Sequence, residues 1–325
     1  MSGPAAARPR PSNAGWMSEL AAADVTPPRR EKISDLAASR PFFERMADLS
    51  DLPTDVTVEE VTLRERDGTP LTAEVYRPAA PGPHPLLLHI HGGGYCVGSV
   101  RGDRKVAMEQ AARGYVVVSP EYGLAPEHPF PWAVEDCVFT ARWAVSQAES
   151  LGADDRGVIL EGGSAGAGLA AATMNALLGE GGPLPGAELP GAPEITVRGV
   201  VLLYGMLSFP LLYSHSGSNV GSVELWHRAY LGPHYTTKVH DPLASPLYTT
   251  QAARWPATYL SCGAEDSFLR HTLEMTTVLA EAGVSTTCSV VADLDHGYAK
   301  FNRPPARAEM ARIQSWLDSL TEVTE

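Results

Sequence analysis

Two glycine-rich turns constrain the fold of this chain more than any other feature of its sequence. The first, His91-Gly92-Gly93-Gly94, follows an apolar run at 86–90, and the second, Gly162-Gly163-Ser164-Ala165-Gly166, follows an apolar run at 158–160. Short, continuously apolar runs that end in glycine are typical of buried parallel strands. The second turn has the G-x-S-x-G pattern of a sharp strand-to-helix turn that exposes a serine hydroxyl. Together the two turns indicate an α/β fold in which the end of a strand presents a serine nucleophile.

The rest of the chain alternates between strand-like and helical segments. Strands are predicted at 56–58 and 71–76 around the turn residues Asp67-Gly68, and further apolar runs lie at 115–118, 200–203, 258–260 and 288–291. Helical patterns separate these runs at 132–148, 168–178 and 269–282, and a final helix is predicted at 306–320. This alternation predicts an α/β fold, with a mostly parallel central sheet flanked by helices.

The chain is predicted to contain one catalytic domain with a helical cap. Residues 1–15 are proline-containing and lack an apolar segment, so we expect a disordered lead-in. Residues 16–50 show helical patterns that Pro27-Pro28 and Pro41 interrupt. The catalytic domain is expected at 51–325, with an insertion at about 208–238 that is too long for a bare loop. We expect this insertion and the N-terminal helices to form the cap.

Composition excludes several classes of protein. The 325 residues carry a formal net charge of −13, which argues against nucleic-acid binding because that function needs a basic face. No run of about 18 apolar residues is present, so no membrane span is expected. The four cysteines, Cys96, Cys137, Cys262 and Cys288, show no C-x-x-C pair and are interpreted as buried thiols of a cytoplasmic protein. A homodimer is left open.

A serine hydroxyl is a weak nucleophile unless a base removes its proton and a third group orients that base. In the α/β-hydrolase chain order, an acid follows the serine and a histidine comes last. His296 lies in a loop after a predicted strand, whereas His271 lies within a helical run, where a histidine is usually solvated. Asp295, beside His296, is expected to be a solvated loop residue. The acid should follow the strand ending near Gly263, which leaves Asp266 and Glu265 as alternatives, with Asp241 more distant.

Other interpretations of the two glycine turns are weaker. A dinucleotide-binding turn requires a second strand ending in an acidic residue, but the chain around Glu180 is rich in glycine and proline. A phosphate-binding loop requires a Lys-Ser or Lys-Thr pair, which is missing after the glycines. His89 and His91 share a strand face without a third metal ligand at useful spacing, so no metal or other cofactor is expected. His91 is expected to hold the glycine loop through a backbone hydrogen bond.

Several motifs resemble the hormone-sensitive-lipase family of α/β-hydrolase esterases. His91-Gly92-Gly93-Gly94 is similar to its H-G-G-G motif, and Gly263-Ala264-Glu265-Asp266 is similar to its G-x-x-D. The segment 121–131, E-Y-G-L-A-P-E-H-P-F-P, resembles D-Y-R-L-A-P-E-H-P-F-P, and 241–247 resembles D-P-x-x-S-P-L. His296-Gly297-Tyr298 resembles H-G-F. These motifs occur in the family's order between about residues 85 and 298.

The resemblance implies a site and an activity. Ser164 would be the nucleophile, Asp266 the acid and His296 the base, and the N–H groups of Gly92, Gly93 and Ala165 would form the oxyanion hole. The implied reaction is hydrolysis of small carboxylic esters with short to medium acyl chains through an acyl-enzyme. An acyltransferase or amide hydrolase would use the same three side chains and is the alternative. A non-catalytic receptor would be expected to lack one of them.

The chain departs from the family pattern at several positions, including the second acid commonly seen after G-x-x-D, where Leu269 or Arg270 stands here. Gly163 stands where the family usually has Asp or Thr, Gly123 replaces an arginine, and Trp132 replaces a small residue. These departures bear on substrate range and on the support of the site. Aromatic residues near the cap are candidates for a substrate pocket, with ordinary packing as the alternative for each; they are Tyr95, Trp132, Phe209, Tyr213 and Trp226.

Overall fold

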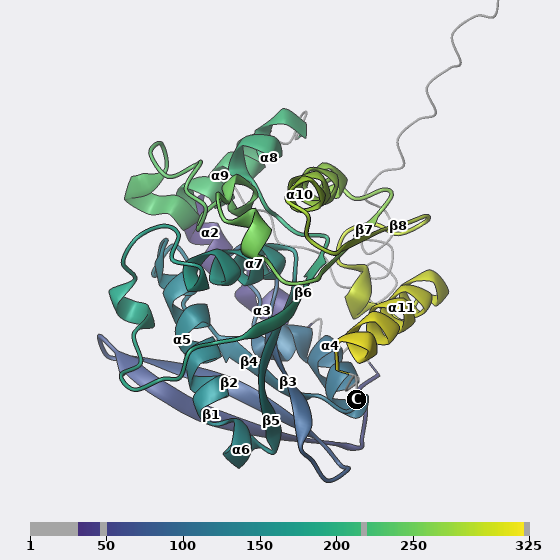
Figure 1. The fold of residues 1–325 in the computed structure, drawn as a ribbon. Coiled ribbons are helices and arrows are strands. Elements are labelled where there is room, and N and C mark those ends of the chain that lie inside the picture. The colour runs from purple at the N-terminus through teal and green to yellow at the C-terminus, as the bar shows by residue number, and fades with distance from the viewer. Residues whose placement is uncertain (1–31, 46–50, 216–219, 322–325) are drawn as a thin grey trace, which may run out of the picture.

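The computed structural model describes residues 32–45, 51–215 and 220–321. Its centre is an eight-stranded sheet with the strand order β1-β2-β4-β3-β5-β6-β7-β8 (Figure 1). Strands β1 and β2 run antiparallel to their neighbours, and the other strands are parallel. The predicted mostly parallel sheet is therefore confirmed. The strands are β1 (Val56–Arg66), β2 (Thr69–Pro78), β3 (His84–Ile90), β4 (Val116–Glu121), β5 (Ala153–Gly163), β6 (Val197–Leu203), β7 (Thr258–Gly263) and β8 (Thr286–Val291).

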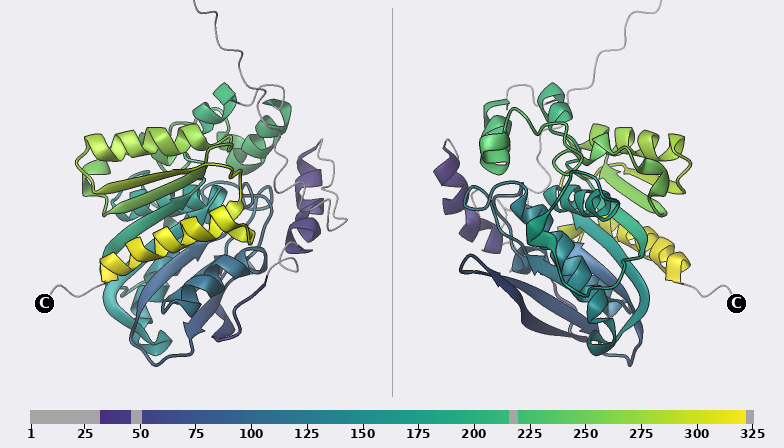
Figure 2. Two further views of the ribbon diagram at one scale, coloured as in Figure 1. Left: turned by 90° about the vertical axis from the view of Figure 1, so that its right-hand side faces the viewer. Right: turned by 60° about the vertical axis from the view of Figure 1, so that its left-hand side comes forward.

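Helices cover both faces of the sheet because its central strands are apolar on both sides. Leu86 and Leu88 of β3 face a core that includes α5 (Trp132–Ser146), α7 (Ala165–Leu177) and α10 (Leu269–Glu281). Leu87 faces the opposite core with α4 (Val100–Ala112) and α11 (Pro304–Thr321). Figure 2 shows these two helical layers from the side. The helices predicted at 132–148, 168–178, 269–282 and 306–320 correspond to α5, α7, α10 and α11.

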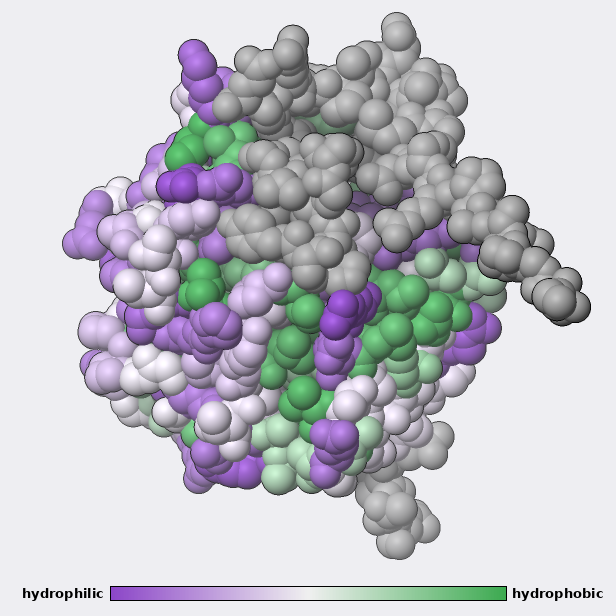
Figure 3. Space-filling model, turned by 90° about the horizontal axis from the view of Figure 1, so that it is seen from above, coloured by the Kyte–Doolittle hydropathy of each residue, from purple (hydrophilic) through white to green (hydrophobic). Residues whose placement is uncertain are grey.

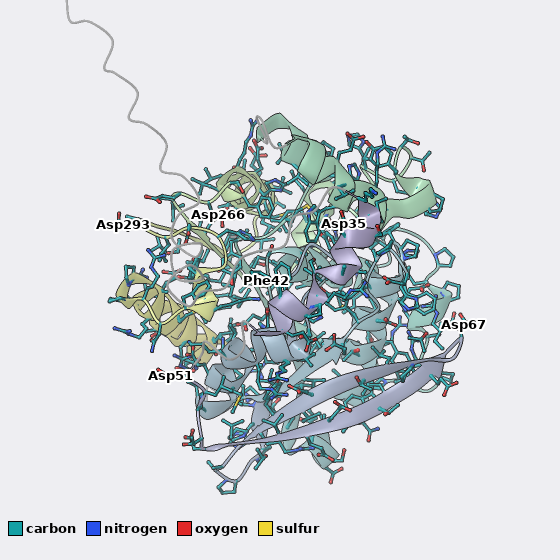
Figure 4. The ribbon with its side chains drawn as sticks, turned by 180° about the vertical axis from the view of Figure 1, so that it is seen from behind. Asp35, Phe42, Asp51, Asp67, Asp266 and Asp293 are labelled. Atoms are coloured by element: carbon teal, nitrogen blue, oxygen red, sulfur yellow. The ribbon has the colours of Figure 1, made fainter. Side chains whose placement is uncertain are left out.

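A two-residue turn joins β1 to β2. Asp67 has φ 51° and Gly68 has φ 76°, which matches the left-handed pair that tight hairpins require. Figure 4 shows Asp67 at the tip of this hairpin, far from Asp266 above the sheet. The predicted Asp67-Gly68 turn is confirmed, and it lies remote from the glycine turns that follow β3 and β5.

Short helices lie above the end of the sheet where β3 and β5 finish (Figure 1). Within 208–238 these are α8 (Phe209–His215), α9 (Val220–Leu231) and the 3₁₀-helix η4 (Gly232–His234). From the N-terminal segment, α2 (Ile33–Ala38) packs against α9, and α3 (Arg40–Arg45) follows it. Figure 3 looks down on this end of the molecule. Predictions for residues 1–31 and 46–50 lie outside the described residues, and the division into cap and catalytic domain stays a prediction.

The remaining short elements connect the main layers. They are α6 (Ala148–Leu151), η2 (Pro185–Ala187), η5 (Pro246–Tyr248), η6 (Ala252–Arg254) and η7 (Tyr298–Lys300). Within the part of the chain that the structure describes, none of the helices combines the length and the apolar composition that crossing a bilayer requires.

Arg40, the first residue of α3, attaches the N-terminal helices to two of the motif loops. Its guanidinium donates to the carbonyl oxygens of Cys96 (3.0 Å) and Ala125 (3.1 Å). It also donates to both carboxylate oxygens of Glu127, at 3.2 and 2.6 Å. A planar guanidinium suits such a multiple contact because its five N–H groups are held in a fixed fork. The segment before the sheet is therefore fixed beside the glycine loop.

The cysteines follow the sequence interpretation at three of four positions. Cys96, Cys137 and Cys262 are buried free thiols. Cys288 is a free thiol but is exposed, so the expectation of burial was wrong there. The reason is its position on β8, an edge strand with neither a second neighbouring strand nor a full helical cover.

Candidate active site

The turn after β5 forces Ser164 out of the sheet. Ser164 has φ 59° and ψ −120°, between the end of β5 at Gly163 and the start of α7 at Ala165. A serine with positive φ costs on the order of 1–3 kcal/mol, so the surroundings must impose it. A side chain at Gly166 would place its Cβ 2.0 Å from the carbonyl oxygen of Ile90, and one at Gly162 would lie 2.4 Å from the backbone of Gly166. Only glycines permit this turn.

Three side chains from three loops form one hydrogen-bonded chain. His296 Nε2 lies 2.8 Å from Ser164 Oγ, and His296 Nδ1 lies 2.9 Å from Asp266 Oδ2. With Nδ1–H donated to the carboxylate, Nε2 is left to accept the proton of the serine hydroxyl. The structure thus brings together the serine, the histidine and the carboxylate that the sequence analysis singled out.

The geometry distinguishes Asp266 from the two other carboxylates considered. The Asp266 side chain is fully buried, and its Oδ1 accepts a hydrogen bond from the Phe268 N–H at 2.8 Å. Glu265 is exposed. Asp241 accepts instead from the N–H of Leu243 and from Lys238, at 2.9 and 2.7 Å. Asp266 alone of the three contacts His296, so the geometry favours Asp266 over Glu265 and Asp241 as the group that orients the imidazole.

Two aromatic rings hold the imidazole of His296 from its sides, and the sequence analysis did not identify either. Tyr204 meets it edge to face at a centroid distance of 5.2 Å, and Phe268 does so at 4.9 Å. Tyr204 follows β6 with φ 41°. A Cβ at Gly163 would lie 3.0 Å from the Tyr204 ring, so glycine at this departure from the family pattern leaves room for the tyrosine.

The hydrogen bonds of the first glycine loop correct one predicted oxyanion donor. The N–H of Gly92 donates to Asp103 Oδ2 at 3.1 Å inside the fold, so it is not free to bind a substrate oxygen. Within the described residues, the N–H groups of Gly93 and Gly94 have no protein acceptor. The N–H of Ala165 is likewise unpaired because it lies in the first turn of α7. The available set is therefore Gly93, Gly94 and Ala165.

His91 holds the same loop from the other side. Its Nδ1–H donates to the carbonyl oxygen of Gly92 at 2.9 Å, as expected for a histidine that holds the loop. The ring stacks on Tyr122 with centroids 4.1 Å apart. Complete burial lowers the pKa of His91 to about 4, so the ring is neutral at physiological pH.

A buried group of charged side chains lies beneath the glycine loop, and the sequence analysis missed it. His89 on β3 pairs in register with Glu161 on β5, and its Nδ1 lies 2.9 Å from Glu161 Oε1. Burial alone would lower the pKa of His89, but Asp103 and Glu161 outweigh it and raise the pKa to about 9. Asp103 forms an ion pair with Lys300. The available signal was one ionisable residue at the end of each predicted strand, His89 within the apolar run at 86–90 and Glu161 directly after the run at 158–160.

The predicted pocket aromatics divide into different roles. Tyr95 and Phe209 are buried; Tyr95 stacks on Tyr230 at 3.8 Å, and Phe209 stacks on His227 at 4.3 Å. Both therefore pack α8 and α9 onto the sheet domain. Trp226 lies against the glycine loop, because a Cβ at Gly94 would come 2.4 Å from its indole ring. The side chain of Tyr213 lies outside the described residues.

The ring contacts of Trp132 are with residues outside the two glycine turns. Its ring packs on His128 at 4.3 Å, and the Arg66 guanidinium lies 3.7 Å above the ring centroid. A Cβ at Gly123 would come 2.5 Å from the indole. The Trp132 ring therefore fills the space that a side chain at position 123 would need, so the two departures from the family pattern are linked. The nearby Asp136 accepts from the Gly123 N–H at 2.9 Å and pairs with Arg64 at 2.6 Å. We therefore leave Trp132 out of the pocket.

Two residues near the site differ from their predicted exposure. His271 is buried, and its Nδ1 accepts a hydrogen bond from the Leu207 N–H at 3.1 Å. It thus fixes the segment that leaves β6 for α8. Asp295 is also buried, and Arg303 donates to it at 3.2 Å. Both were expected to be solvated. The helix and loop that carry them pack against other elements, which the local sequence does not specify.

Comparison with known proteins places this chain within a family. A sequence model described as the alpha/beta hydrolase fold matches residues 87–300. Esterase LipI of Mycobacterium tuberculosis (strain ATCC 25618 / H37Rv) is 27% identical over 266 residues, covering 79% of this chain and 80% of LipI. The chain belongs to the alpha/beta hydrolase fold family.

Solved structures of esterases are similar to this chain over most of its length. The structure titled "Bacterial Heroin Esterase" superposes with a TM-score of 0.79 at 27% identity, covering 94% of this chain and 98% of that one. An esterase from the bacterial hormone-sensitive lipase family superposes with a TM-score of 0.75 at 27% identity, covering 95% and 97%. This chain is a carboxylic-ester hydrolase of the hormone-sensitive-lipase family, as the motif resemblance predicted.

Proposed function

We propose that the protein hydrolyses small carboxylic esters with Ser164 as nucleophile, through a covalent acyl-enzyme. The observation that carries this proposal is the unbroken chain of hydrogen bonds from Ser164 Oγ through His296 to Asp266. The three side chains are linked in the order that such catalysis requires: a nucleophile, a base that takes its proton, and a group that orients the base.

In the first half-reaction, Ser164 Oγ attacks the ester carbonyl carbon while His296 Nε2 takes the hydroxyl proton. The carbonyl oxygen becomes negative and is bound by the N–H groups of Gly93, Gly94 and Ala165. The buried Asp266 carboxylate stabilises the imidazolium that forms. The tetrahedral intermediate then collapses: the bond to the alkoxy oxygen breaks, His296 returns its proton to that oxygen, and the alcohol leaves.

In the second half-reaction, water replaces the alcohol. His296 removes a proton from the water, whose oxygen attacks the acyl carbon, and the same N–H groups bind the oxyanion. Collapse breaks the bond to Ser164 Oγ, which regains its proton from His296, and the carboxylic acid leaves. The N–H groups are already oriented in the free protein, so they require no rearrangement as the charge develops.

Covalent labelling tests this proposal directly. A fluorophosphonate should react with one residue of the native protein, and peptide mass spectrometry should find the adduct on Ser164. The labelled protein should no longer release p-nitrophenol from p-nitrophenyl acetate. An adduct at another serine, or unchanged turnover after complete labelling of Ser164, would contradict the assignment. Adding alcohol or amine acceptors to the assay separates hydrolysis from acyl transfer.

We further propose that the pocket takes short to medium acyl chains, with Trp226 as one wall. The indole lies on Gly94, which is itself one of the proposed oxyanion donors, and Tyr95 and Phe209 fill the space beneath the helices. Pockets lined by aromatic side chains discriminate by about 1–3 kcal/mol for each methylene that does or does not fit.

Trp226→Ala should therefore shift the preference of the enzyme towards longer acyl chains. We expect the ratio of kcat/KM for p-nitrophenyl octanoate to that for the acetate to rise about tenfold, because one or two methylenes gain space. Trp132→Ala is the matched control, since it removes an indole outside the pocket. It should lower Tm and leave the ratio unchanged. An equal shift in both variants would exclude a specific role for Trp226.

A further inference from the structure

The two halves of the site are connected by one ion pair. Asp103 in the first turn of α4 binds the glycine loop, because its Oδ2 accepts the Gly92 N–H at 3.1 Å. Its other oxygen, Oδ1, pairs with the ammonium of Lys300. Lys300 ends the 3₁₀-helix η7, four residues after His296. A single carboxylate thus contacts both the loop of the proposed oxyanion donors and the segment that carries the proposed base.

On the loop side, Gly92 is held at both of its polar groups. Its N–H is bound by Asp103, and its carbonyl oxygen accepts from His91 Nδ1 at 2.9 Å. Fixing both groups fixes the planes of the adjoining peptides. The N–H groups of Gly93 and Gly94 follow directly along the chain, so their directions depend on these two bonds.

On the histidine side, Lys300 closes the turn that begins beside the base. Its backbone N–H donates to the carbonyl oxygen of Gly297 at 3.2 Å, and Gly297 is the neighbour of His296. The Lys300 ammonium reaches from this turn to α4, and η7 packs against α4. A shift of η7 would move both Lys300 and the imidazole.

The charges around this pair balance. Asp103 and Glu161 are buried carboxylates, and His89 and Lys300 are the cations that contact them. His89 Nε2 lies 3.7 Å from Asp103 Oδ2, and Gln110 donates to Glu161 at 2.7 Å. Buried charges persist only when they are paired, so each member of this group constrains the others.

We propose that Asp103 and Lys300 are a positioning pair that sets the distance and direction between the oxyanion donors and His296. The pair acts through its contacts with Gly92 and with the turn that carries His296. The inference rests on the proposed function, because it assigns the pair a role in that reaction. Geometry in such sites must hold to within about 0.5 Å, and a displacement of 1 Å costs roughly 100-fold in rate.

Lys300→Met tests the pair, since methionine keeps much of the side-chain length and removes the charge. With p-nitrophenyl acetate we expect kcat to fall about 10- to 100-fold while KM stays within about twofold. Affinity for a trifluoromethyl ketone, which forms a tetrahedral adduct on serine, should fall by the same factor as kcat/KM. Lys300→Arg should recover most of the loss because it keeps a cation beside Asp103.

Lys105→Met is the matched control. Lys105 lies on the same helix as Asp103, and its ion pair is with Glu109 of that helix. Both lysine variants lose one ion pair, so a general effect on folding should appear in both. We expect the control to retain wild-type kcat and ketone affinity. An equal loss in both variants would overturn the positioning role.

A double variant keeps the test decisive if Lys300→Met unfolds at the assay temperature. Asp103→Asn combined with Lys300→Met removes both charges but retains an amide oxygen that can accept the Gly92 N–H. We expect its Tm to recover while kcat stays about tenfold or more below wild type. Recovery of wild-type kcat in the double variant would overturn the proposal, as would a raised KM with unchanged kcat in Lys300→Met.

Failure of the proposed function gives a different result from failure of this inference. If Ser164 is not the nucleophile, the fluorophosphonate does not label it in the wild type, whatever Lys300 does. If Ser164 is labelled and Lys300→Met is fully active, only the positioning role is lost.

Discussion

Alanine in place of Ser164 should lower kcat for p-nitrophenyl acetate by roughly 10⁵- to 10⁶-fold. The reason is that the variant removes the atom that bonds to the acyl group and leaves His296 with no hydroxyl to deprotonate. Residual turnover should come from water bound near the oxyanion donors. Steady-state kinetics, with far-ultraviolet circular dichroism to confirm the fold, measure this effect.

Ser164→Ala should stay folded, so a loss of activity in this variant can be separated from a loss of structure. Ser164 Oγ contacts only His296 among the described polar groups, so its removal should leave Tm within a few degrees of wild type. A variant that is folded and retains more than about 1% of wild-type kcat would mean that another nucleophile operates. Loss of the fold would instead mean that the turn tolerates no change, and fluorophosphonate labelling would then decide the assignment.

Asp266→Asn should lower kcat about 10⁴-fold, the second largest effect we expect. The amide can donate a hydrogen bond to Nδ1, which would place the imidazole proton on Nε2, where it cannot accept from serine. The Asp266 side chain is fully buried, so bulk solvent cannot take the place of the lost carboxylate. Kinetics across an ester concentration series should show a loss in kcat with a small change in KM.

Glu265→Gln is the natural comparison because it makes the same chemical change one residue away. Glu265 is exposed, and we expect its variant to stay within about twofold of wild type. Comparable losses in the two variants would contradict the assignment of Asp266 as the orienting acid. A large loss in Glu265→Gln alone would transfer that role to Glu265.

The sequence predicted those features of the fold and site that depend on short local patterns. Glycines after apolar runs located the ends of β3 and β5, and the fixed chain order of the hydrolase fold located candidates for the base and acid. Asp266 and Glu265 could not be separated from spacing alone, since both follow β7. Their difference depends on which side chain turns inward, and only the fold determines that.

The features that the sequence did not predict depend on contacts between distant segments. The N–H of Gly92 is unavailable because Asp103, on a helix that packs behind the loop, accepts it. His271 is buried because its helix face, shared with Met275 and Leu279, packs onto the core. A helical period in those three positions was visible, but the histidine was interpreted by its polarity and not by its spacing.

Gly123 and Trp132 have a consequence for how this chain can change over evolutionary time. The indole fills the volume that any side chain at 123 would need, so restoring the arginine of the family motif at 123 alone meets a steric barrier. Shrinking Trp132 alone leaves a void beneath Arg66. We therefore expect the effects of substitutions at 123 and 132 to be non-additive. A side chain at 123 should fit only where the indole of Trp132 has moved or has been replaced by a smaller residue.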